Sequence, residues 1–287
     1  MATRTQLQKT EEYSKEQLEN LQYTREQLEK TENKLRSDAI SNYADSVRKL
    51  DINIVTERFM GKMNWDKSFY LPLVQLNGKN YLIGESSSIF LLNQISSHYM
   101  KVLTLNLTAA KPDQKDAGQT ENIGGPLYVN PARTAIFFPV VQQNNKALKV
   151  ISYQDLKQRG VQNLTLFKAG SYGKETADLQ GRCSLGLSEN PDGSAYLYIR
   201  NSKQGSELQA GLGDFVLSKE GDFVGIVVAL KSSNLTAKTE AVCWILPKDI
   251  QVEKMPQLRL NKKDSAVYYE DFSKDFQKIF SDVILPE

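Results

Sequence analysis

The first sixty residues contain neither glycine nor proline, whereas the first glycine is Gly61 and the first proline is Pro72. The same stretch is dense in Glu, Gln, Lys and Leu, which are all good helix formers. A long segment without either helix breaker is typical of a continuous helix. The sequence therefore predicts a helical segment over residues 1–60 and a separately organised unit over residues 61–287.

An apolar stripe runs along this predicted helix. Its members, several of them seven residues apart, are Leu18, Leu21, Leu28, Leu35, Ala39, Val47, Leu50 and Ile54. So narrow a stripe does not hold a lone helix, because most helix stability in proteins comes from packing an apolar face. We therefore expect residues 3–55 to form a coiled-coil stalk through which the chain forms a homo-oligomer. A solvated helix lying on its own domain is the alternative, and the irregular spacing leaves the oligomer number open.

The chain after Gly61 consists of short alternating apolar runs separated by turn signals such as Asn77-Gly78. These runs lie at 69–76, 80–84, 89–93, 101–107, 134–141, 163–168, 182–188, 194–200, 214–218, 222–230 and 241–247. So many short strands at near-regular spacing favour a barrel or sandwich over a βαβ sheet. A helical turn predicted over 153–160 divides the strands into two sets of about six. The spacing of apolar residues also predicts an amphipathic helix over 267–283.

Residues 207–230 resemble the segment that carries the nucleophile in trypsin-like serine proteases. That family shows Gly-Asp/Asn-Ser-Gly-Gly-Pro, a short strand, a turn, and a strand of the type Val-x-Gly-Ile-Val. The later part of the pattern is present here as the strand 215–217, the turn 219–222 and the strand 223–228. Counting back from Gly225 places Leu212 where the family has its serine.

The resemblance to this family, and within it to the HtrA-like branch, extends over about residues 66–252. It implies a mainly β fold of two six-stranded antiparallel barrels, at about 66–150 and 160–252, preceded by the long helix and followed by the C-terminal one. The strand 81–86 and the segment 89–95 are similar to those around the family's histidine, which places Ile95 at the position of the base. The strand 134–140 is similar to the one that begins with the acid, and Thr134 occupies the acid's position.

All three positions of the triad thus lack its chemistry. A triad needs a nucleophile, a base and an orienting acid, and neither Leu212 nor Ile95 nor Thr134 supplies one. His98 is the only histidine, and Cys183 lies within a strand-like run rather than on a glycine-rich turn. The sequence therefore predicts a catalytically inactive pseudoprotease that acts as a scaffold or as a protein- or peptide-binding module.

Proteases of this fold hold their substrate as an extended strand, so we expect Val227, Val228, Ala229 and Leu230 to accept a peptide by strand addition. Two other functions stay open. One is an active serine-type peptidase with a misaligned or non-standard site, and the other is a purely structural subunit of a larger assembly.

Charge and composition bound the other partners. The 36 basic and 34 acidic residues leave a net charge of +2, which gives no electrostatic reason to expect nucleic acid. One histidine and two cysteines do not form the usual zinc set, and no nucleotide motif is present, so we expect neither metal nor cofactor.

A signal-like start and a membrane-spanning run are not visible, which predicts a soluble chain. The compartment stays open, since an export signal is removed on maturation, and so does a disulfide between Cys183 and Cys243.

Overall fold

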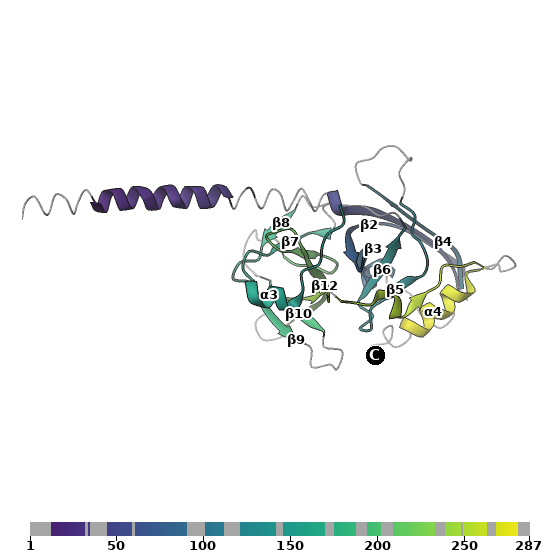
Figure 1. The fold of residues 1–287 in the computed structure, drawn as a ribbon. Helices are drawn as coiled ribbons and strands as arrows, with labels where there is room; N and C mark the ends of the chain where they lie inside the picture. The colour runs from purple at the N-terminus through teal and green to yellow at the C-terminus, as the bar shows by residue number, and fades with distance from the viewer. Residues whose placement is uncertain are drawn as a thin grey trace, which may run out of the picture.

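We describe the protein from a computed structural model (Figure 1). The structure describes residues 13–31, 34, 45–58, 61–90, 101–111, 121–141, 146–169, 175–187, 194–201, 209–232, 239–247, 249–262 and 268–280. Within these residues the protein is mainly β, which confirms the predicted fold class at that level. Two antiparallel seven-stranded sheets form its body and lie side by side in Figure 1.

The first sheet has the strand order β14-β5-β6-β3-β2-β1-β4. Its members are β1 (Val47–Arg58), β2 (Gly61–Leu76), β3 (Lys79–Glu85), β4 (Lys101–Ala110), β5 (Leu127–Val129), β6 (Ala135–Val140) and β14 (Gln257–Leu258). The turn at Asn77-Gly78, where both residues have positive φ, joins β2 to β3 as the sequence predicts. The late strand β14 returns to pair with β5 at the edge of this sheet.

The second sheet has the strand order β8-β7-β11-β12-β13-β10-β9. Its members are β7 (Thr165–Phe167), β8 (Thr176–Asp178), β9 (Cys183–Leu187), β10 (Ala195–Arg200), β11 (Phe215–Leu217), β12 (Phe223–Ser232) and β13 (Thr239–Ile245). Gly225 is required in β12, because a Cβ there would lie 2.0 Å from the backbone oxygen of Trp244 on β13.

The predicted pair of six-stranded barrels is therefore wrong in strand number and in its boundaries. Strand β1 begins at Val47, before the predicted start at 66, and β14 at 257–258 lies beyond the predicted end at 252. Both strands belong to the first sheet, as does β5, which the alternating pattern did not indicate. Strands β5 and β14 have only three and two residues, so they carry few alternating positions and their sequence signal is weak.

The long N-terminal helix is shown only in part. Residues 13–31 are helical, and Figure 1 shows this helix apart from the two sheets. Residues 47–58, in contrast, form β1, so the prediction of a helical stalk through residue 55 is wrong in that part. Val47, Leu50 and Ile54 are buried because β1 pairs with β2 on one side and with β4 on the other. Tertiary pairing outweighed the weak preference of this stretch for helix.

One hydrophobic core spans the two sheets, and a second cluster, which includes Leu197 and Val216, lies at the second sheet. Phe137 on β6 packs edge-on against Trp244 on β13, with the ring centroids 6.2 Å apart. Phe215 and Phe223 of the second sheet belong to the same buried cluster as the residues of the first. Burying one such aromatic side chain contributes about 1.5–3 kcal/mol to folding, so these contacts fix the sheets against each other.

Three short helices complete the described body. Helix α3 (Tyr153–Arg159) lies where a helical turn is predicted, and Ser152 caps it by accepting a hydrogen bond from the Asp155 N–H. Helix α4 (Glu270–Phe280) confirms the predicted C-terminal helix within 270–280. Helix α2 (Ser86–Phe90) replaces the start of the strand predicted over 89–93, and residues 91–93 lie outside the described residues. The ring of Phe90 in α2 packs against that of Phe276 in α4, with the ring centroids 5.4 Å apart.

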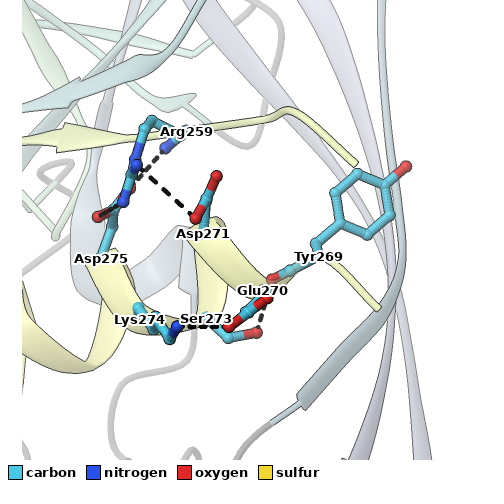
Figure 2. A network of polar contacts seen from close by, with 7 residues as sticks. All are labelled: Arg259, Tyr269, Glu270, Asp271, Ser273, Lys274 and Asp275. Atoms are coloured by element: carbon cyan, nitrogen blue, oxygen red, sulfur yellow. Dashed lines mark hydrogen bonds and ion pairs between the residues drawn. The ribbon is translucent and has the colours of Figure 1, made fainter. Parts of the chain in front are cut away.

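Helix α4 bridges the two edges of the first sheet. At its start, the Tyr269 N–H donates to the backbone oxygen of Val102 on β4, and the Ser273 hydroxyl accepts from the Val102 N–H. Farther along, Asp275 accepts two hydrogen bonds from the Arg259 guanidinium, which follows β14, at 2.7 and 2.8 Å (Figure 2). The helix thus closes the sheet where strand pairing does not.

None of the helices in the described part of the chain combines the length and the apolar character that crossing a membrane would need.

Candidate functional site

The predicted nucleophile position lies on a tight turn between the two sheets. The Asp214 N–H donates to the Gly211 oxygen at 3.2 Å, which closes a four-residue turn around Leu212 and Gly213. Gly213 has φ +81°, a left-handed conformation that glycine adopts without steric cost. Leu212 is 41% exposed at the tip. The turn therefore presents a hydrocarbon side chain to solvent on a well-defined backbone.

Asp214 holds the base of this turn. Its carboxylate is buried and accepts hydrogen bonds from the Gly211 N–H at 2.7 Å and from the Ala169 N–H at 3.1 Å. The Lys168 ammonium lies 2.6 Å from the same carboxylate. Because charge-assisted hydrogen bonds are the strong ones, Asp214 fixes the turn to the end of β7.

Asn201 binds both backbone polar groups of Ala210, the residue before the turn. Its side chain accepts from the Ala210 N–H and donates to the Ala210 oxygen, each at 2.9 Å. A trypsin-like oxyanion hole would need an N–H at this place that points into the cleft. The Ala210 N–H points to Asn201 instead, so this donor is not available to a substrate.

A cavity of about 180 Å³, here called the cleft cavity, opens between the sheets beside Leu212. Its lining comes from β2, β3, α2, the end of β7 and the turn, and consists of Ser68, Phe69, Tyr70, Leu71, Glu85, Ser88, Ile89, Ala169, Leu212 and Gly213. Cavities for drug-sized ligands measure about 300–1,000 Å³. The cleft cavity is smaller and has room for a single side chain.

Glu85 supplies the one charged side chain among the described residues of that lining. It is only 3% exposed and sits at the end of β3, immediately before α2. Its carboxylate accepts from the Ser87 and Ser88 N–H groups, both at 2.8 Å, and from the Ser88 hydroxyl at 2.6 Å. The carboxylate thus caps α2 and binds two of its three serines, Ser87 and Ser88.

Thr134, at the predicted acid position, lies next to the same helix and not in the cleft cavity. Its backbone oxygen accepts from the Ser86 N–H at 3.0 Å, and its own N–H donates to the side chain of Asn130 at 2.8 Å. Ile95, the predicted base position, and His98 lie outside the described residues. Among the described residues, four polar side chains line the cleft cavity together with Leu212, namely Ser68, Tyr70, Glu85 and Ser88.

The predicted peptide-binding strand is only partly accessible. The Val227 N–H donates to the Asp214 oxygen, and the Val227 oxygen accepts from the Gly213 N–H. Val227 and Val228 are buried, Ala229 is half-buried and Leu230 is 47% exposed. Both backbone groups of Val227 are thus already bonded within the chain, and Ala229 and Leu230 pair on one side with Val242 and Ala241 of β13.

Neither cysteine forms a reactive or bridged site. Both are free thiols, on β9 and β13, and β10 pairs between these strands. Neighbouring strands are about 4.8 Å apart, so two strands separated by a third are too distant for a disulfide. Burial raises the pKa of the Cys183 thiol to about 12 and also raises the pKa of Cys243. Both thiols stay protonated at neutral pH and are poor nucleophiles.

A larger cavity of about 490 Å³ lies beside α4 and is lined by Arg133, Pro256, Gln257, Arg259, Asp275, Lys278 and Ile279. None of the predicted site residues lines it, and its acid, Asp275, is already bound to Arg259. Within the part of the chain that the structure describes, no three His, Cys, Asp or Glu side chains gather as they would around a metal ion.

Several residues of this site escaped the sequence analysis. Glu85 directly follows a predicted strand, and Asp214 directly follows Gly211-Leu212-Gly213. The place of each in the sequence could therefore have marked it as a residue near the site. Asn201 and Lys168 had none, because their partners are nine and forty-six residues away.

Comparisons with known proteins add a distant structural likeness. No protein-family model and no curated protein matches this sequence. Among solved structures, the HtrA-type protease AlgW with a decapeptide matches at a TM-score of 0.41 and 12% identity, over 74% of this chain and 63% of that chain. A substituted form of the same protease with a decapeptide matches at 0.41 and 11%, over 74% and 62%. This chain thus spans less than two thirds of the structures it matches, and we draw no conclusion on activity from them.

Proposed function

We propose that this protein is a catalytically inactive relative of trypsin-like proteases that acts as a scaffold or peptide-binding module. The observation that carries the proposal is the turn 210–214. Asp214 and Asn201 hold its backbone, and its tip is Leu212, which has no lone pair and no ionisable proton. The bond from the Ala210 N–H to Asn201 removes an oxyanion donor as well.

The helix over 13–31 supports self-association as part of this function. Leu18, Leu21 and Leu28 are 57%, 66% and 60% exposed, and their spacing places them on one side of the helix. Three exposed leucines along one stripe favour a second copy of the same helix as the partner. A scaffold with this organisation would present several sheet bodies on one stalk.

One specific observation favours an active hydrolase as the second candidate. The Ser88 hydroxyl lies 2.6 Å from the Glu85 carboxylate, within reach for a nucleophile and its base. The same carboxylate also binds two backbone N–H groups of α2, so helix capping accounts for its position without any catalysis.

The test is hydrolysis of casein and of short fluorogenic amides and esters, together with labelling by a fluorophosphonate. We expect no turnover above buffer, no labelling, and no activity in Leu212→Ser, because that change restores neither base nor acid. Turnover that disappears in Ser88→Ala and persists in Ser68→Ala would overturn the proposal and establish the second candidate.

A further inference from the structure

One buried carboxylate, that of Glu85, lines the cleft cavity. Glu85 is 3% exposed, and among the described residues no basic side chain pairs with it. Lys168, which follows β7 and contacts the turn, is bound to Asp214 and to the Gln209 oxygen. A buried charge is costly unless it is paired, so a cation that entered the cavity would gain a desolvated partner.

The carboxylate also keeps acceptor capacity for such a cation. An ionised carboxylate accepts about four hydrogen bonds, and Glu85 accepts three, of which only the one from Ser87 goes to Oε1. The remaining acceptor site belongs to Oε1. An ammonium group could therefore bind without displacing the cap of α2.

The rest of the cavity suits an aliphatic chain. Phe69, Leu71, Ile89, Ala169 and Leu212 supply apolar surface, and the volume of about 180 Å³ corresponds to about six water molecules at about 30 Å³ each. A lysine side chain combines an aliphatic stem with a terminal cation, which matches an apolar cavity with one buried carboxylate.

We propose that the cleft cavity binds a lysine side chain of a peptide partner, with the ammonium group at Glu85 and the methylene groups along Leu212. The inference rests on the proposed peptide-binding function and names the chemistry of its ligand. It assigns to Leu212 the role of an apolar wall that covers the stem of the bound side chain.

Fluorescence anisotropy with three labelled peptides, acetyl-Gly-Ala-Xaa-Ala-Gly, tests the preference, with lysine, norleucine or glutamate at Xaa. Because hydrogen bonds to charged groups are stronger than neutral ones, we expect the lysine peptide to bind about ten- to a hundredfold more tightly than the norleucine peptide. Glu85→Gln should abolish this difference, and Leu212→Trp should weaken all binding by filling the cavity. Glu220→Gln, which changes an exposed carboxylate on a remote turn, should leave the preference intact.

A second measurement on the unmodified protein keeps the inference testable if Glu85→Gln unfolds. In amide NMR spectra, n-butylammonium should shift the Ser87, Ser88 and Gly213 signals, whereas 1-butanol at the same concentration should not. Absence of these shifts, or equal affinity for all three peptides, would overturn the inference. Binding without charge preference would leave the proposed peptide-binding function standing, whereas butylammonium shifts without any peptide binding would support the cation site and count against that function.

Discussion

Single residues decide the chemistry of the cleft. Leu212 stands on a turn whose backbone is fixed by Asp214, and the neighbouring Ala210 is bound on both sides by Asn201. These contacts keep the shape of the turn independent of the side chain at its tip. We therefore expect substitutions of Leu212 to leave the backbone of the turn unchanged.

We expect the single residue Glu253 to make the stability of the protein depend on pH. Hydrogen bonds from Lys79 at 2.8 Å and from Tyr81 at 2.9 Å lower its pKa from 4.5 to about 2. The folded state thus binds this proton less readily than the unfolded state does. The stabilisation is present above about pH 4.5 and is lost as the pH falls towards 2.

Urea unfolding of Glu253→Gln checks this expectation. The variant should be less stable than the natural protein at pH 6, by a modest amount because the side chain is 41% exposed. The difference should shrink as the pH falls below 4.5. Lys79→Met serves as the matched variant, and adding it to Glu253→Gln should cost little more. A difference that stays constant from pH 6 to pH 2.5 would refute the assignment.

Among the elements, helix α4 has the clearest architectural task. Its N-terminal end is tied to β4 through Tyr269 and Ser273, and its middle is tied to the chain after β14 through Asp275 and Arg259 (Figure 2). The apolar face, with Phe272, Phe276 and Phe280, is fully buried and meets Phe90 of α2. Since α2 carries Ser88, the same helix also supports one wall of the cleft cavity.

Replacing Arg259 by lysine should loosen α4 from the β14 edge. Lysine keeps the charge but cannot make the paired contact that the planar guanidinium makes with Asp275. We expect faster amide hydrogen exchange over residues 270–280 in Arg259→Lys, with the exchange of β12 and β13 unchanged. Lys274→Gln, which removes only the exposed contact with Glu270 within the helix, is the control. Equal protection of α4 in both variants would show that the apolar face alone holds the helix.

The whole molecule combines a two-sheet body with an exposed helix. The body has its own core, which includes Val47 at the start of β1 and Phe280 at the end of α4. The helix over 13–31 contributes nothing to that core, because all of its described side chains are exposed. Self-association and folding are therefore expected to be separable.

A pair of truncations tests this separation. Removing residues 1–44 should convert the proposed oligomer into a monomer that still unfolds cooperatively. Removing residues 1–55 should abolish folding, because it deletes Val47 to Val55 of a strand that pairs with both β2 and β4. Light scattering gives the mass, and circular dichroism during urea titration gives the cooperativity. A monomeric full-length chain would refute self-association, and a folded protein without residues 1–55 would refute the role of β1.

Local patterns in the sequence determined much of this protein. Alternating apolar residues located most of the strands, Asn77-Gly78 located a hairpin, and the spacing of Phe272, Phe276 and Phe280 located α4, because each signal depends on neighbours in the chain. These features follow from backbone conformation and periodicity within a few residues.

Only the tertiary structure decided the rest. Residues 47–58 form a strand because β2 and β4 pair with it on both sides. The apolar residues of 47–58 would also fit the stripe of a helix, so their spacing alone did not distinguish the two. The contact of Asn201 with Ala210 and the shared cleft of Glu85 with Leu212 join segments that no local pattern connects. The burial of the Glu85 carboxylate becomes visible only when the cavity around it is known, since burial and pairing are properties of the folded chain.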